Sequence, residues 1–255
     1  MKMIITAVLT SALMSSVAWA DSCDYSRDIN FDVDASGLEQ VILDLGAGHL
    51  VVSQAENVNQ VSVRARACAD SRRRLESTDL VQNRRGDRLT ISSDIEDSLS
   101  FSLFNEDYAY IDVDILLPPG LVLEIEDGSG EIRIDGVEAE LRIEDGSGDI
   151  SIRRHQGLVE IDDGSGSIDL DDIAGALWLV DGSGDIDVRH VSGNVHVPSD
   201  GSGSIRIRDV RGNVMIDDDG SGSISVHSIT GDMTVGDSGS GSVNYGDIGG
   251  SVRLD

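Results

Sequence analysis

Lysine is almost absent from this sequence of 255 residues, because Lys2 is its only copy. Lysine and arginine together number 19 against 47 aspartates and glutamates, so the formal net charge is −28 at pH 7. Binding of nucleic acid or of an anionic membrane needs clustered positive charge. The composition therefore argues against both kinds of partner, and it favours a soluble protein that associates with cations or with a basic partner.

Long apolar stretches are also rare. Residues 1–20 combine Lys2, an apolar run over 4–17 and the small-x-small sequence Ala18-Trp19-Ala20, which together are typical of a secretory signal peptide. That run is too short for a comfortable transmembrane helix, and no later stretch approaches 18 apolar residues. We therefore expect an exported protein without a membrane segment in its mature chain, located in the periplasm or else at the cell surface or secreted.

Cysteine occurs only twice, as Cys23 and Cys68, and there is no Cys-x-x-Cys sequence. In an oxidising compartment two such residues favour one disulfide, which would staple the start of the mature chain to its N-terminal region. We predict that this disulfide is structural and has no redox role.

A glycine-rich repeat dominates the C-terminal half. The sequence Asp-Gly-Ser-Gly occurs six times, and Ser238-Gly239-Ser240-Gly241 is a seventh, altered copy. Successive copies are 18 residues apart three times and then 19 apart three times. A fixed period of this length is the signature of a solenoid, in which each repeat buries its apolar face only against its neighbours.

Apolar residues within each repeat recur at a spacing of two. Ile132 and Ile134 follow one Gly-Ser-Gly, and a second pair, Leu141 and Ile143, follows the next small residue. Alternation of this kind indicates short strands, and a helical period of 3.6 fits none of it. Glycine suits the turns between the strands. We predict an all-β protein, a parallel β-solenoid (single-stranded β-helix) of about 18–19 residues per coil.

The chain divides into three parts. Residues 1–20 are the signal peptide, 21–120 a β-rich head and 121–255 the regular solenoid. Within the head, 46–52 match the later repeats and indicate a degenerate coil. Residues 69–81 carry Leu75 and Leu80 among charges, with Asp70 or Ser71 available as an N-cap, and this pattern predicts a short helix.

Stacking of coils would place six aspartates in one row. Neighbouring carboxylates about 5 Å apart repel by about 1 kcal/mol in water and about 3 kcal/mol at an effective dielectric of 20. Either each aspartate caps its own turn by accepting backbone N–H bonds, or the row is an edge that binds divalent cations, Ca²⁺ above all. In the alignment with calcium-binding β-rolls, however, the ligand aspartate is replaced by Ile150 and its equivalents. The row, which we call the aspartate row, comprises Asp127, Asp145, Asp163, Asp181, Asp200 and Asp219.

Trp178, His196 and Met215 share one outward position in successive coils. An exposed apolar strip is typical of a carbohydrate or protein contact. Two interpretations stay open, namely that the strip, here called the Trp178 row, binds a partner, or that the head folds over it.

Catalytic patterns are weak. The five histidines lie in no Ser-His-Asp order, and the repeated Gly-Ser-Gly is not a hydrolase elbow. A polysaccharide lyase on a β-helix would use clustered aspartates and an arginine, for which four residues of one face are candidates, but charges on a solvated face explain them equally well. These are Arg153, Arg154, Asp171 and Asp172. We therefore predict no enzyme activity and no cofactor.

Three features together carry a resemblance to a known family. They are Leu43-Asp44-Leu45-Gly46-Ala47-Gly48 in the head, Leu117-Pro118-Pro119-Gly120-Leu121 before the repeats, and the Asp-Gly-Ser-Gly-x-Ile-x-Ile repeat itself. The chain resembles the bacterial "putative adhesin" family of exported β-strand-repeat envelope proteins. The resemblance implies a β-helix that acts as an adhesin, envelope scaffold or binding module, with a protein or a glycan as partner.

Two further expectations concern alternatives and assembly. The alternative to a binding module is a structural element that associates with Ca²⁺ along the aspartates, and a polysaccharide-acting enzyme ranks below it. No capping helix follows Val252-Arg253-Leu254-Asp255 in the sequence, so we expect either end-to-end self-association or protection of the last coil by Asp247 and Asp255 alone.

Overall fold

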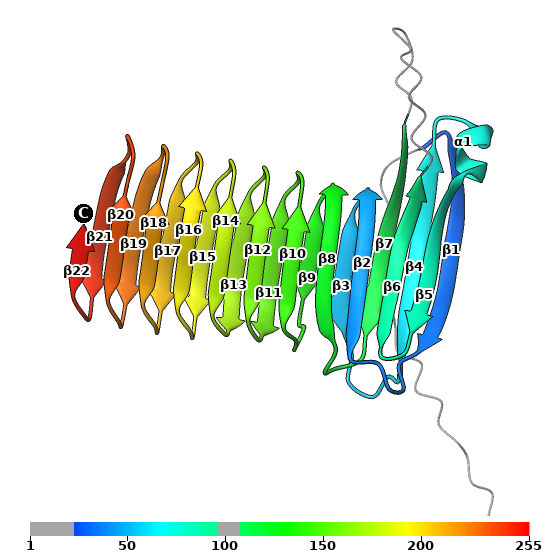
Figure 1. Ribbon diagram of the computed structural model, residues 1–255, viewed down its shortest axis with the longest axis horizontal. Coiled ribbons are helices and arrows are strands. Elements are labelled where there is room, and N and C mark those ends of the chain that lie inside the picture. Colours follow the sequence, from blue (N-terminus) through cyan, green and yellow to red (C-terminus); the bar gives the residue numbers. More distant parts are fainter. Residues whose placement is uncertain (1–22, 96–107, 255) are drawn as a thin grey trace, which may run out of the picture.

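The computed structural model describes residues 23–95 and 108–254, so the predicted signal peptide lies outside the described residues. Strands are the dominant secondary structure of the described chain, and they form two sheets of 11 strands each. The strands stack as successive coils in one elongated row (Figure 1). The predicted parallel β-solenoid is confirmed.

Each regular coil contributes one strand to each sheet. In the first sheet these strands are β9 (Ile132–Asp135), β11 (Ile150–Gln156), β13 (Ile168–Ala174), β15 (Ile186–Val191), β17 (Ile205–Val210), β19 (Ser223–Ile229) and β21 (Ser242–Ile248). In the second sheet they are β8 (Val122–Ser129), β10 (Leu141–Asp145), β12 (Val159–Asp163), β14 (Leu177–Asp181), β16 (Val195–Asp200), β18 (Val214–Asp218), β20 (Met233–Asp237) and β22 (Val252–Leu254).

The register of these strands follows the sequence repeat. Ile150 is the register partner of Ile132 on one side and of Ile168 on the other, which are its equivalents one repeat away. Side chains at these positions are buried, as are the apolar pairs of the second sheet from β8 to β20, whereas Val252 and Leu254 of β22 are exposed. A slip of one residue would expose every one of them, so the alternation of apolar residues sets the register.

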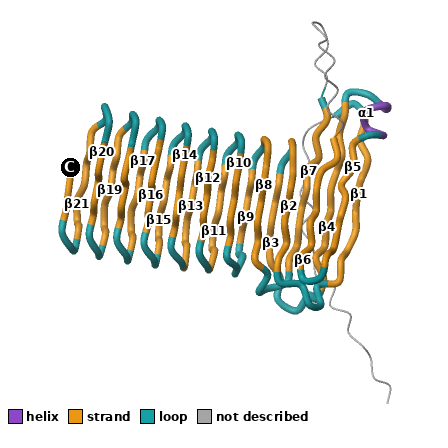
Figure 2. The backbone as a smooth tube through the Cα atoms, viewed as in Figure 1, coloured by secondary structure: helices purple, strands orange, loops and turns teal. Residues whose placement is uncertain are grey.

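Glycine is required where neighbouring coils approach most closely. Gly148 has φ +142°, and a Cβ at that position would lie 1.7 Å from the carbonyl oxygen of Gly130 in the preceding coil. The turns that contain these glycines line one end of every coil, as the loop segments in Figure 2 show. Near the C-terminal end of each first-sheet strand from β11 to β21, the chain bends at a non-glycine residue with a left-handed φ of 52° to 61°. These residues are Arg154, Asp172, His190, Asp209, Ser228 and Asp247.

The strands of the head extend the same two sheets. In the first sheet, the edge order β1-β4-β7-β3 leads into β9, and in the second sheet β5-β6-β2 leads into β8. The pairs β1–β4, β4–β7 and β5–β6 are antiparallel, whereas β3 and β2 pair in parallel with the strands on both of their sides. The bounds are β1 (Tyr25–Asp34), β2 (Gln40–Ala47), β3 (Leu50–Gln54), β4 (Gln60–Ala69), β5 (Thr78–Arg85), β6 (Arg88–Ile95) and β7 (Ala109–Leu117).

A short helix, α1 (Arg72–Glu76), lies in the head as predicted, with Ser71 as its N-cap. The expected range of 69–81 was too long, because Thr78 and the residues after it pair with β6 as strand β5. Thr78 and Leu80 are buried there, two residues apart, which is the alternation of a strand. No helix in the described ranges is long and apolar enough to cross a membrane.

The predicted disulfide is present. Cys23 and Cys68 are bonded, with their Cα atoms 5.7 Å apart. The disulfide ties the first described residue to strand β4, next to the edge strand β1.

Candidate functional site

The Trp178 row lies on the outer face of the second sheet. Trp178 of β14 is the register partner of His196 in β16, which in turn is the partner of Met215 in β18. Trp178 is 36% exposed and Met215 44%, so the described head leaves this face open to solvent. His196 is held by a hydrogen bond of 2.8 Å between its Nε2 and Oδ2 of Asp217.

A hollow of about 200 Å³ adjoins Trp178. Its polar lining comes from Arg142, Glu144, Glu160 and Asp162 of the two preceding coils. Arg142 Nη2 lies 2.6 Å from Oε1 of Glu144, and Arg142 Nη1 lies 3.7 Å from Oε2 of Glu160. The hydrogen bond and negative charge of Glu144, with a smaller contribution from Glu160, raise the pKa of the Arg142 guanidinium.

The sequence interpretation did not single out these four polar residues, although the repeat contains the signal. Glu160 and Arg142 occupy the Trp178 position in the two preceding coils, as the registers Glu160–Trp178 and Arg142–Glu160 show. Following that one row back from Trp178 by the repeat length would have found both residues.

A larger hollow of about 540 Å³ continues from the first across the same end of the second sheet. Glu144 and Asp162 line both hollows. The acidic residues that line the larger one are Asp44, Glu126, Asp127, Glu144, Asp145 and Asp162. No basic side chain lines it.

The aspartate row lies inside the solenoid and not on an exposed edge. All six residues are buried, and Asp163, for example, is 2% exposed. Four of the six aspartates lie two residues beyond a buried apolar residue of their repeat, as Asp145 does after Ile143, and alternation along a strand therefore turns them inward. Asp200 and Asp219 lie three residues beyond Val197 and Ile216, so a period of two predicts the burial of the first four only.

Three of the six aspartates cap their turns by accepting hydrogen bonds from backbone N–H groups. The backbone N–H of Ser165 donates to Oδ1 of Asp163 at 3.1 Å, and that of Ser183 donates to Oδ1 of Asp181 at 3.0 Å. Ser147 donates to Asp145 in the same way at 3.3 Å. The second oxygen, Oδ2, of each of these three aspartates receives no hydrogen bond.

Burial and mutual repulsion raise the pKa values of the row. Burial first, and then the charges of Asp145 and Asp181, raise the pKa of Asp163 to about 7, although its turn N–H bonds act in the opposite direction. Burial and a neighbouring carboxylate likewise raise the pKa of Asp127 to about 7. The pKa of Asp200 is also raised to about 7 by burial and by both neighbouring aspartates. A buried carboxyl group with such a pKa is partly protonated near neutral pH.

A Ca²⁺ site along this row remains a prediction. Among residues 23–95 and 108–254, no group of three or more histidine, cysteine or acidic side chains is arranged to hold a metal ion. Calcium takes six to eight oxygen ligands, and many of them come from exposed loops or water. The aspartate row is buried and has one carboxyl group per coil, so it differs from this arrangement of calcium ligands.

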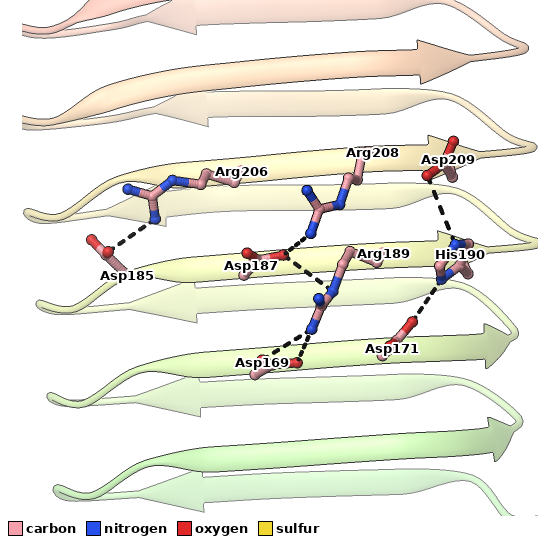
Figure 3. A network of polar contacts seen from close by, with 9 residues as sticks. All are labelled: Asp169, Asp171, Asp185, Asp187, Arg189, His190, Arg206, Arg208 and Asp209. Atoms are coloured by element: carbon pink, nitrogen blue, oxygen red, sulfur yellow. Dashed lines mark hydrogen bonds and ion pairs between the residues drawn. The ribbon is translucent and has the colours of Figure 1, made fainter.

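The outer face of the first sheet is charged but largely neutralises itself (Figure 3). Arg189 Nη2 lies 2.9 Å from Asp169, and Arg206 Nη1 lies 2.9 Å from Asp185. His190 lies between two aspartates, with its Nδ1 2.7 Å from Asp171 and its Nε2 3.8 Å from Asp209. Basic and acidic groups of adjacent coils thus pair along the solenoid axis.

The four residues considered for a polysaccharide-acting enzyme lie on this face and at its bends. Arg154 pairs with Asp135, and Asp171 is bonded to His190. Arg153 and Asp171 are register partners in adjacent strands, whereas Asp172 occupies a left-handed bend. Ion pairs on a solvated surface account for this arrangement.

The fold is shared with solved bacterial proteins. A protein named as a putative lipid binding protein, from Parabacteroides distasonis ATCC 8503, is 16% identical, with a TM-score of 0.50 over 91% of this chain and 97% of its own. A putative cell adhesion protein from Clostridium sporogenes ATCC 15579 is 10% identical, with a TM-score of 0.32 over 91% of this chain and 100% of its own. A putative adhesin from Parabacteroides merdae ATCC 43184 is 10% identical, with a TM-score of 0.34 over 91% and 95%.

No family model and no curated protein sequence matches the chain. At these identities the likeness to solved structures concerns the fold, and function has to be argued from surfaces of this chain.

Proposed function

We propose that this chain is an exported, non-enzymatic binding module of the cell envelope, and that it binds its partner, a protein or a glycan, through the outer face of the second sheet around Trp178. One observation carries the proposal: a large aromatic side chain is exposed beside a hollow lined by charged groups. Aromatic side chains on a rigid exposed face are typical of contact surfaces.

The scaffold suits such a role. Every strand of the second sheet from β8 to β22 pairs with the next coil, so the outward side chains form straight rows on a continuous surface. Solenoids use extended surfaces of this kind for binding. The disulfide between Cys23 and Cys68 supports an oxidising location, of which the periplasm is the one we propose.

The placement of the histidines supports a role without catalysis. His155 is fully buried, and burial lowers its pKa to about 4, so it is neutral near pH 7. His190 and His196 each bond an aspartate on a solvated face. These pairs are surface contacts between residues of neighbouring coils.

Chemical crosslinking in native envelopes tests the proposal. The double variant Trp178→Ala/Met215→Ala should lose the crosslinked partner that the unmodified chain retains. The control is Ser225→Ala/Asn244→Ala, which changes two register partners in the outward row of the first sheet. Equal recovery of the same partner by all three chains would contradict the proposed surface.

A further inference from the structure

The two outer faces differ in how their charges are balanced. On the first sheet, arginines pair with aspartates of neighbouring coils (Figure 3). On the second sheet, Arg142 is the only basic side chain among the outward residues of β2, β8, β10, β12 and β14. The outward acidic residues of the same strands are Asp44, Glu124, Glu126, Glu144, Glu160 and Asp162. The outer face of these five strands therefore carries uncompensated negative charge.

These acidic residues stand in rows. Asp44 pairs in register with Glu126, Glu126 with Glu144, and Glu144 with Asp162. Adjacent strands are about 4.8 Å apart, so the row extends roughly 14 Å along the solenoid axis. We call the hollow over this row the acidic groove, and it adjoins the hollow beside Trp178 through Glu144 and Asp162.

The floor of the acidic groove contains two further acidic side chains. Asp127 and Asp145 line it, and they are 9% and 6% exposed. Oδ2 of each of these two buried side chains receives no hydrogen bond. The outward carboxylates of the row above them focus the field in the groove and raise the local concentration of cations. Burial raises the pKa values of Asp127 and Asp145, and a cation bound in the groove would favour their charged forms.

Arg142 shows how this face holds a cation. Its guanidinium lies between Glu144 and Glu160, next to the hollow that Trp178 lines. Only this one basic residue serves six outward acids, so positions along the row remain for further guanidinium or ammonium groups. Such a group placed over the Trp178 ring would also be attracted to the face of the ring by the cation–π interaction.

We propose that the acidic groove and Trp178 together bind an extended basic polypeptide segment, whose arginine or lysine side chains lie along the row from Asp44 to Asp162 and end against Trp178. This inference rests on the proposed function and names the chemistry of its partner. Charge complementarity favours a basic polypeptide over a neutral glycan, because sugar hydroxyls would leave the excess of carboxylates uncompensated.

Tryptophan fluorescence tests the inference at the site itself. The chain contains only two tryptophans, and Trp19 belongs to the predicted signal peptide, so Trp178 is the sole reporter when the protein is produced without residues 1–20. The probe is a blocked octapeptide of alternating arginine and serine, compared with its glutamate counterpart and with chitohexaose. We expect the basic peptide alone to change the Trp178 emission saturably, and its Kd to rise at least tenfold between 50 and 300 mM NaCl, because screening weakens exposed charge pairs.

Two matched double variants distinguish binding in the acidic groove from non-specific attraction by the net negative charge of the protein. Glu144→Gln/Asp162→Asn should weaken binding at least fivefold. Asp172→Asn/Asp247→Asn removes the same charge at exposed left-handed bends, which asparagine tolerates, and should leave the Kd unchanged. Thermal melts of both variants check that the fold is retained.

Three results would overturn the inference. These are an unchanged Trp178 emission with up to 1 mM basic peptide, equal weakening by both double variants, or a response to chitohexaose that is stronger than the response to the peptide and insensitive to salt. In the last case the proposed binding function would stand with a glycan as partner. If the Trp178→Ala/Met215→Ala chain also retains its envelope partner, the proposed function fails as well.

Discussion

Asp145 and Asp163 are register partners at the ends of β10 and β12, and both side chains are buried inside the solenoid. Two like charges in this position repel each other and lack the hydration that would stabilise them. The row continues through Asp181, which pairs with Asp163 on its other side. Each coil therefore stacks a group that is costly to ionise on an equivalent group in the next coil.

The first prediction concerns this cost. Asp163→Asn keeps an oxygen that can accept the N–H of Ser165 and removes the charge, so we expect it to stabilise the protein at pH 8. A gain of about 1 kcal/mol corresponds to roughly 2–4 °C in Tm for a domain of 150–250 residues. The exposed Asp172→Asn is the matched control and should leave Tm unchanged. A lower Tm for Asp163→Asn would contradict the ionisation cost.

The second prediction is the pH dependence of that gain. The pKa of Asp163 is about 7 in the folded chain and near the ordinary 3.8 in the unfolded chain. The stability that its proton supplies is therefore complete below about pH 4 and is lost as the pH rises through 7. The difference in Tm between Asp163→Asn and the unmodified chain should vanish at pH 4 and be largest above pH 7. A difference that does not vary with pH would contradict the raised pKa.

The pH dependence of stability that His155 contributes has the opposite sign. Burial lowers its pKa to about 4 from the ordinary 6.5, so the stability due to its neutral form is lost as the pH falls from about 6.5 through 4. Comparing the two chains at each pH cancels this contribution, because both contain His155.

The third prediction concerns the close approach of coils. Gly148→Ala would place a Cβ 1.7 Å from the carbonyl oxygen of Gly130 at φ +142°, so a backbone shift is unavoidable. We expect a loss of about 3 kcal/mol or more in the free energy of unfolding, measured by urea denaturation. Gly136→Ala is the control, since φ is +68° there but nothing lies within 4 Å of the added Cβ. It should cost about 1 kcal/mol. Equal costs would contradict the packing of the turns.

The fourth prediction concerns the disulfide. Cys23 and Cys68 are 45 residues apart in sequence, and a loop of that length stabilises the folded state by about 4 kcal/mol in the chain-entropy model. Replacing both cysteines by serine should lower the urea midpoint, and dithiothreitol should do the same to the unmodified chain alone. An unchanged urea midpoint in both experiments would show that the disulfide does not stabilise the protein.

The fifth prediction separates turn capping from cation binding. Because the aspartate row is buried, thermal melts in millimolar calcium and in chelator should give the same Tm. A rise in calcium that the Asp163→Asn chain lacks would instead support the Ca²⁺ interpretation of the row.

The sequence predicted the fold closely because one physical rule, alternation at a period of two, governs every coil. The same rule turns Asp145 inward after Ile143, and the alternatives of a turn cap or a cation edge, which follow from the repulsion of like charges in a row, do not include this burial. The helix ended earlier than predicted, because Thr78 pairs with Ile95 across the sheet, a contact that local propensity does not contain. The hollow beside Trp178 depends on side chains from three coils, and only the stacked register brings them together.

Hydroxyl-radical footprinting of the protein in native envelopes, compared with the isolated protein, tests the binding surface most directly. Trp178 and Met215 are exposed in the isolated chain, and Tyr245 of the first sheet is an exposed control at 47%. The account predicts that oxidation of Trp178 and Met215 falls severalfold in the envelope while that of Tyr245 is unchanged. Equal oxidation of all three residues in both samples would contradict it.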